Sequence, residues 1–171
     1  MAGSRIYFYR RLVDSDESIV WRMLYEAAHV AEEGLSVESI RADPYLAKYA
    51  AGWGRAGDLG VAAFEREGSE PVGAAWVRLP VAGDRSDGDS VGQTPELAFG
   101  VIPAHRGKGV GTELLRLLLE AAREPFRGVT LTVRTGNPAI RLYERFGFRR
   151  LPGDLMNRVG GRSVRMYAIW K

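Results

Sequence analysis

The chain has 171 residues, 46% of them apolar, which suits a single domain over residues 1–171 with a sizeable core. It contains no cysteine, and this excludes disulfides, thiolate metal sites and a cysteine nucleophile. No run approaches the roughly 18 apolar residues of a membrane helix, and no apolar leader follows Met1, so we expect a soluble, cytoplasmic protein without a membrane partner.

The net charge of +3 is concentrated towards the end of the chain. Residues 134–171 contain nine basic and two acidic side chains, a surplus of seven. Such a surface can receive the phosphates of a cofactor, bind RNA, or simply be solvated. The aromatic residues of this segment, Tyr143, Phe146 and Phe148, are better explained by a core and a site than by stacking on bases, so a nucleic-acid partner is disfavoured but left open.

The sequence of the first half of the chain predicts a strand over residues 5–10, followed by a helix. Asp14 and Glu17 resemble a capping box that begins this helix, and Gly34 is expected to end it. A shorter helix is predicted from Pro44 to about Ala51. Residues 58–64 and 72–79 are expected to form an antiparallel hairpin, and residues 80–94 have the glycine and aspartate content of a loop.

The second half predicts alternating strands and helices. Residues 96–102 form a strand that is apolar on both faces, and residues 113–123 form a leucine-rich helix with one polar stripe. A strand over residues 129–134 is expected to lie parallel to the first, and Pro138 lies early in the next helix. Residues 148–151 and 163–170 complete a mixed α/β sheet of six or seven strands with helices on both faces.

Three alternating glycines, Gly107, Gly109 and Gly111, lie where the leucine-rich helix begins. Without Cβ atoms, their backbone N–H groups can approach an anion at the positive end of the helix dipole. Arg106 and Lys108 add positive charge there. The spacing G-x-G-x-G fits neither a Walker loop nor a Rossmann turn, which leaves a site for a phosphorylated cofactor of another kind or a glycine-rich turn that only begins a core helix.

Two runs of sequence resemble one known family. Residues 101–111 resemble the acyl-CoA signature R/Q-x-x-G-x-G/A of the GNAT superfamily of N-acyltransferases. Residues 137–148 resemble the Asn…LYE-x-x-GF element of the same family, and the two motifs occur in the family's order. Asn137 precedes Tyr143 by six residues, whereas many members of the family have seven.

This resemblance implies a GNAT-like fold and an N-acetyltransferase. The enzyme would move an acetyl group from acetyl-CoA to a primary amine of a small molecule, peptide or protein, by direct transfer through a ternary complex and without a metal. The pantetheine arm would pair with the strand, and the Val101 N–H would bind the developing oxyanion. The implied cofactor-binding residues are Phe99, Gly100, Val101, Arg106, Gly107, Lys108, Gly109, Val110, Gly111, Thr112 and Asn137.

The resemblance also implies two catalytic residues. Tyr143 matches the tyrosine that protonates the coenzyme A thiolate, although a phenol of pKa about 10 facing a thiolate near 8.5 makes this transfer uphill by about 2 kcal/mol. Glu96 is the candidate general base, or else it only orients the substrate. His105 is expected at the surface and His29 on the first helix, partly packed.

The acceptor is weakly specified by the sequence. The aromatic residues that could line its pocket, or pack in the core instead, are Trp21, Tyr25, Tyr45, Tyr49, Trp53 and Trp76. A non-catalytic acyl-CoA-binding regulatory module and an RNA-associated acetyltransferase are alternative functions, and a homodimer is left open.

Overall fold

A computed structural model describes residues 7–81 and 94–170. Most of the predicted loop 80–94 and the first two residues of the predicted strand 5–10 therefore lie outside the described residues. The strands are β1 Phe8–Arg11, β2 Leu59–Phe64, β3 Pro71–Arg78, β4 Glu96–Val101, β5 Gly128–Arg134, β6 Arg149–Met156 and β7 Arg162–Ile169. The α-helices are α1 Glu17–Ala27, α2 Val37–Ala42, α3 Pro44–Ala47, α4 Val110–Ala122 and α5 Ala139–Arg145, and the 3-10 turns are η1 Asp14–Asp16, η2 Val30–Glu33 and η3 Pro103–His105.

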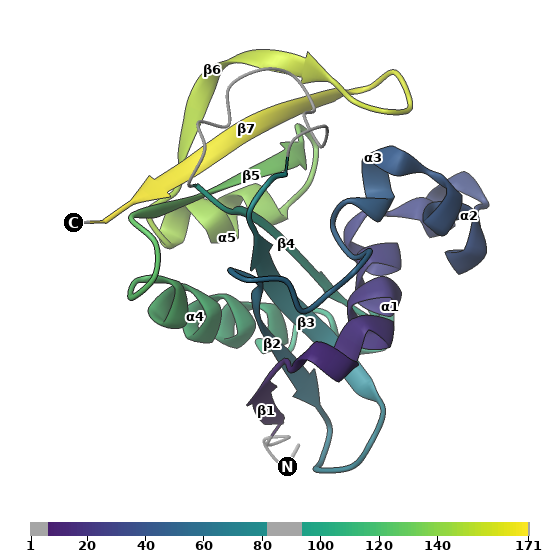
Figure 1. The fold of residues 1–171 in the computed structure, drawn as a ribbon. Helices are drawn as coiled ribbons and strands as arrows, with labels where there is room; N and C mark the ends of the chain where they lie inside the picture. The colour runs from purple at the N-terminus through teal and green to yellow at the C-terminus, as the bar shows by residue number, and fades with distance from the viewer. Residues whose placement is uncertain (1–6, 82–93, 171) are drawn as a thin grey trace.

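The strands form one seven-stranded sheet in the order β1-β2-β3-β4-β5-β7-β6, with helices on both faces (Figure 1). One core cluster joins the sheet to α4 and α5, through residues such as Leu114, Leu118 and Ile140. The other joins it to α1, α2 and α3, through residues such as Met23 and Ile40. The predicted mixed α/β fold class, the β2–β3 hairpin and the parallel β4–β5 pair are confirmed.

The sheet opens between its two central strands. β4 and β5 share a single register pair, Glu96 with Thr130, whereas β5 pairs with β7 along its whole length (Figure 1). On its other side β4 pairs with β3 from Glu96 to Val101. One edge of β4 is therefore left facing a gap inside the sheet.

The helical segment after β1 differs from the prediction. The Asp14–Glu17 capping box is wrong: α1 begins only at Glu17, after η1, and it is Asp16 that reaches back to accept the Val13 N–H (2.8 Å). Gly34 ends η2, not α1, which stops at Ala27. Short helices like α2, which the sequence reasoning missed, have too few residues for a clear apolar period.

The C-terminal hairpin also differs. The predicted strand ends at residue 151, but β6 continues to Met156 and only residues 157–161 turn. Pro152 and Gly153, which are typical of loops, lie in the irregular stretch between Arg150 and Asp154, where the pairing with β7 shifts register. Proline and glycine are tolerated there because β6 is an edge strand with a bulge. The predicted helix 44–51 is helical only over α3 and continues as turns.

Candidate active site

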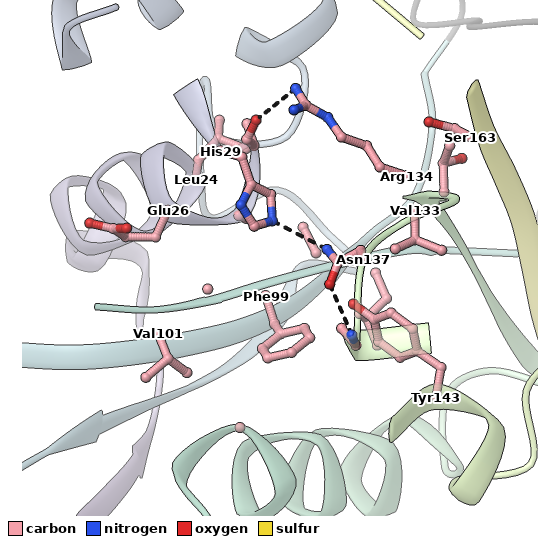
Figure 2. Close-up of a pocket in the computed structure, with 18 of the residues that line it drawn as sticks. Leu24, Glu26, His29, Phe99, Val101, Val133, Arg134, Asn137, Tyr143 and Ser163 are labelled. Atoms are coloured by element: carbon pink, nitrogen blue, oxygen red, sulfur yellow. Dashed lines mark hydrogen bonds between the residues drawn. The ribbon is translucent and has the colours of Figure 1, made fainter. Parts of the chain in front are cut away.

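A cavity of about 670 Å³ opens at the gap between β4 and β5 (Figure 2). Its wall is built from the corner after α1, from α3, from β4 and the glycine turn, and from β5, α5 and the β6–β7 hairpin. Of the predicted site residues, those that line it are Phe99, Gly100, Val101, Arg106, Gly107, Gly109, Gly111, Thr112, Asn137 and Tyr143. Glu96, Lys108 and Val110 are not among the lining residues.

The backbone of β4 faces the cavity at alternate residues. Ile102 N–H donates to Val72 on β3 (2.9 Å), and Thr130 N–H donates to Pro95 on the opposite side (3.0 Å). Because backbone groups alternate in direction along a strand, the polar groups of Phe99 and Val101 point away from β3 and into the gap. The Val101 carbonyl accepts from Arg106 Nε (2.8 Å), which leaves the Phe99 groups and the Val101 N–H directed at the cavity. An extended ligand can pair with these groups like an additional strand.

The glycine turn lies where the leucine-rich helix begins, as the sequence predicted. Gly107 and Gly109 have φ of 69° and 83°, in the left-handed region, and Gly109 is the N-cap of α4. Side chains rarely adopt this conformation, so both positions favour glycine. Gly111 has a different constraint: a Cβ there would lie 3.1 Å from the Phe99 ring, which would have to shift slightly to make room. The turn brings the N–H groups of the first turn of α4 to the cavity wall.

The two cations of the turn are arranged differently. Arg106 lines the cavity and forms an ion pair with Glu26 of α1 (3.1 Å). Lys108 turns its ammonium back to the Ala104 carbonyl (2.7 Å). Val110, the first residue of α4, is buried in the core. The side chains of Lys108 and Val110 are thus not brought to the cavity, although the backbone of this segment adjoins it.

Tyr143 lies on α5, with its ring held between two others. Its centroid is 5.8 Å from that of Phe99, in an edge-on contact, and 5.7 Å from that of Phe148. The hydroxyl points along the cavity wall towards Asn137 (Figure 2). Burial raises the pKa of Tyr143 above its usual value of about 10, so the hydroxyl stays protonated throughout the physiological range.

Glu96 lies at the start of β4, behind Tyr49. The Tyr49 hydroxyl donates to Glu96 Oε1 at 2.5 Å, and Tyr49, not Glu96, borders the cavity. Burial, and then the negative charge of Glu96, raise the pKa of Tyr49 well above that of an ordinary phenol. The neutral hydroxyl of Tyr49 therefore lies between the Glu96 carboxylate and the cavity, an arrangement that the sequence did not indicate.

The segment that carries Tyr49 is fixed by side chains from β3. Trp76 Nε1 donates to the Tyr49 carbonyl (2.9 Å). The buried guanidinium of Arg78 donates to the carbonyls of Ala51 (2.7 Å) and Gly52 (2.9 Å) and pairs with Asp58 (2.8 Å). Because a buried cation needs several acceptors, this network holds the turns after α3 in one place.

The cavity wall also contains a cluster of charges that the sequence reasoning missed. Glu33 accepts from Arg134 of β5 and from Arg158 of the β6–β7 turn, each at 2.6 Å. Burial raises the pKa of Glu33, but the two guanidinium hydrogen bonds outweigh it and leave the pKa lowered. Both arginines line the cavity. These residues are distant in sequence, so no local pattern could have associated them.

The aromatic candidates divide between the core and the cavity. Trp21, Trp53 and Trp76 are buried in the core on the α1 side, and Tyr25 packs against it. Tyr45 and Tyr49 line the cavity. Core packing is therefore the role of most of the six, and two remain for an acceptor.

The two histidines lie elsewhere than predicted. His105 was expected at the surface, but its side chain is buried and its Nδ1 is 2.9 Å from the Tyr7 hydroxyl. η3 follows β4 directly and turns the ring inwards. His29 is partly packed, as predicted, but it follows the end of α1 instead of lying on the helix, with a left-handed φ of 54°, and it lines the cavity.

The chain matches the profile of the Acetyltransferase (GNAT) family over residues 21–148. Over 104 residues it is 38% identical to the N-alpha-acetyltransferase RimI of Mycobacterium tuberculosis, a match that covers 53% of this chain and 61% of the relative. The fold is also that of a ribosomal-protein-alanine N-acetyltransferase from Brucella melitensis, at 25% identity and a TM-score of 0.64, over 95% of this chain and 99% of the other.

A further solved structure, yncA from Salmonella typhimurium with its cofactor acetyl-CoA, is 23% identical with a TM-score of 0.66, covering 97% of this chain and 95% of that one. The fold and the family profile together make the class plain: this chain belongs to the GNAT family of acetyltransferases. The family and fold that the two sequence motifs indicated are thereby confirmed.

Residues 7–81 and 94–170 contain neither a metal-binding cluster nor a membrane-spanning helix. No group of three or more acidic or histidine side chains there could hold a metal ion. No helix in the same part of the chain is long and apolar enough to cross a membrane.

Proposed function

We propose that this protein is an N-acetyltransferase that moves an acetyl group from acetyl-CoA to a primary amine, by direct transfer through a ternary complex. Residues 1–171 would form one catalytic domain. The observation that carries the proposal is the gap beside β4, where a free strand edge, a glycine turn at a helix N-terminus and a cavity meet. This combination suits a ligand with a diphosphate at one end and an extended amide chain at the other.

The proposed binding mode uses backbone more than side chains. The N–H groups from Gly107 to Thr112 would bind the diphosphate, with Arg106 adding charge. The groups of Phe99 and Val101 would pair with the pantetheine arm, and Asn137 would bind it from the other side of the gap. Lys108 would contribute its backbone N–H and its positive charge. Its side chain would make no direct contact with the ligand, since the ammonium is already bonded to Ala104.

The proposed chemistry assigns one task to each polar group. As the amine nitrogen bonds to the thioester carbon, the Val101 N–H stabilises the developing oxyanion. When the C–S bond breaks, Tyr143 gives its proton to the sulfur. The amine proton passes towards Glu96, and the route that the geometry supports is through the Tyr49 hydroxyl, which separates Glu96 from the cavity. If no proton follows this route, the pair only orients the amine.

The acceptor is proposed as an amine of a peptide, a protein or a small molecule. The relatives named for N-terminal and ribosomal-protein alanine acetylation make an N-terminal amine the first class to test. An RNA acceptor or partner is less supported, because basic side chains of the C-terminal segment form ion pairs: Arg134, Arg150, Arg158 and Arg162.

Turnover tests this proposal. The protein is mixed with acetyl-CoA and a panel of alanine-terminated peptides, amino acids, polyamines and aminoglycosides, and the release of free thiol is measured. Thiol release that depends on one class of amine is the expected result. Saturable coenzyme A binding without thiol release on any amine would instead favour the acyl-CoA-binding regulatory module.

A further inference from the structure

His29 is the one residue other than glycine with a positive φ in the described part of the chain, at 54°. Histidine tolerates this region better than most residues, but the conformation still costs energy and persists only where surrounding contacts enforce it. Two contacts do so here. Arg134 Nη2 donates to the carbonyl of Ala28 (3.4 Å) and to Glu33 (2.6 Å), and so holds both ends of the turn against β5.

The imidazole of His29 points across the cavity at Asn137 (Figure 2). Asn137 Oδ1 accepts the Ala139 N–H at 2.9 Å, which fixes the orientation of the amide. The atom that faces His29 is therefore Nδ2, and it lies 3.2 Å from His29 Nε2. Because Nδ2 can only donate, Nε2 must accept. The ring proton then resides on Nδ1, which lies 3.4 Å from Glu32 Oε1.

We propose that His29 is a positioning residue of the coenzyme site: its neutral imidazole holds the Asn137 amide across the gap in the sheet. The proposal rests on the function proposed above, in which Asn137 binds the pantetheine arm. One hydrogen of Nδ2 and one lone pair of Oδ1 remain for that ligand. The turn after α1 and the start of α5 are then joined by a hydrogen bond between residues 108 positions apart.

Protonation of His29 would break this bond, because an Nε2–H and an amide NH₂ are both donors. The charged groups around the ring are Glu32 from η2 and the Glu33–Arg134–Arg158 cluster beside it. On the remaining side lie Asn137, which is not ionised, and the neutral hydroxyl of Tyr143 beyond it (Figure 2). Coenzyme affinity should therefore be highest where the imidazole is neutral and fall as the pH is lowered.

Calorimetry with coenzyme A between about pH 5 and 8, the range in which imidazoles titrate, tests this. The variants are His29→Gly, which suits the left-handed backbone, Asn137→Ala, and the double variant. A lost hydrogen bond predicts that His29→Gly binds roughly threefold to tenfold more weakly than the wild type at pH 8. The difference between the two proteins should become smaller once the imidazole is protonated, and this comparison subtracts the titration of the coenzyme phosphates.

The double variant measures how far the effect of His29 on affinity depends on Asn137. If His29 acts through Asn137, removing the imidazole has no further effect on affinity once Asn137→Ala is present. Additive losses, or a pH dependence identical in wild type and His29→Gly, would overturn the proposal.

Nitrogen NMR of the free protein tests the same contact without a ligand. The chain has only two histidines, so the signals that His29→Gly removes belong to His29. The expected tautomer carries its proton on Nδ1, and the Asn137 side-chain amide should shift as His29 titrates. A proton on Nε2 at neutral pH would refute the proposal. Failure of the wild type to bind coenzyme A at any pH would refute the proposed function instead, and the NMR result would still decide the role of His29.

Discussion

At the scale of single residues, the packing and the proposed chemistry of Tyr143 belong to different parts of the side chain, the ring and the hydroxyl. Its ring contacts Phe99 and Phe148, and phenylalanine would keep both contacts. Tyr143→Phe should therefore leave folding and coenzyme A affinity nearly unchanged and lower kcat by roughly 10²- to 10⁴-fold, the usual contribution of a general acid. Steady-state kinetics with a calorimetric Kd measures both. An unchanged kcat would remove Tyr143 from the mechanism.

The pH profile gives a second test of the same hydroxyl. Because burial raises the pKa of Tyr143, its proton should be lost only above the usual tyrosine value of about 10. Below pH 10, loss of the Tyr143 proton should therefore cause no fall in the rate. Any alkaline decline in this range should be the same in the wild type and in Tyr143→Phe. A decline near pH 8 that disappears in the variant would show that coenzyme binding lowers this pKa, contrary to the burial in the free protein.

At the scale of elements, the close contact between β4 and α1 leaves too little space for a side chain at Gly100. A Cβ at this position would lie 2.5 Å from the Met23 carbonyl and 2.9 Å from the Ala27 N, both backbone atoms of α1. Gly100→Ala must push α1 away from β4 and should cost about 1–3 kcal/mol of unfolding free energy, as overpacked sites do. Urea denaturation measures it.

Gly136 supplies the matched control for Gly100. Its φ is not in the left-handed region, and nothing lies within 4 Å of a Cβ built there. Gly136→Ala should change the unfolding free energy by less than about 1 kcal/mol in either direction, with the gain of a stiffer unfolded chain included. Equal effects of the two substitutions would contradict the close packing of α1 on β4.

At the scale of the whole molecule, the gap divides the sheet into β1–β4 and β5–β7, which are paired through one register position. A ligand that fills the gap adds hydrogen bonds between the halves and binds only the folded protein. At 100 times its Kd, coenzyme A should stabilise the protein by about 2.7 kcal/mol, which corresponds to a Tm increase of roughly 5–10 °C. Differential scanning calorimetry over a series of coenzyme concentrations measures it; a Tm independent of concentration would contradict binding in the gap.

Much of this arrangement could be predicted because its causes are local. Consecutive apolar residues from Leu97 to Val101 specify a strand covered on both faces, and Gly107 and Gly109 supply the left-handed φ of the turn, a conformation that favours glycine. The boundaries were less predictable. α1 ends early because tertiary contacts hold His29 in a left-handed conformation, and β6 tolerates Pro152 because it lies at an edge.

The sequence by itself determined the family, the order of the elements and the glycine turn, since each depends on residues close together in the chain. Only the tertiary structure decided which polar side chains meet. Glu33 and Arg158 are 125 positions apart, His29 and Asn137 are 108 apart, and Glu96 lies behind Tyr49 across 47 residues. Such contacts depend on how helices and strands pack around the gap, and the spacing of residues in one segment contains no information about a partner in another.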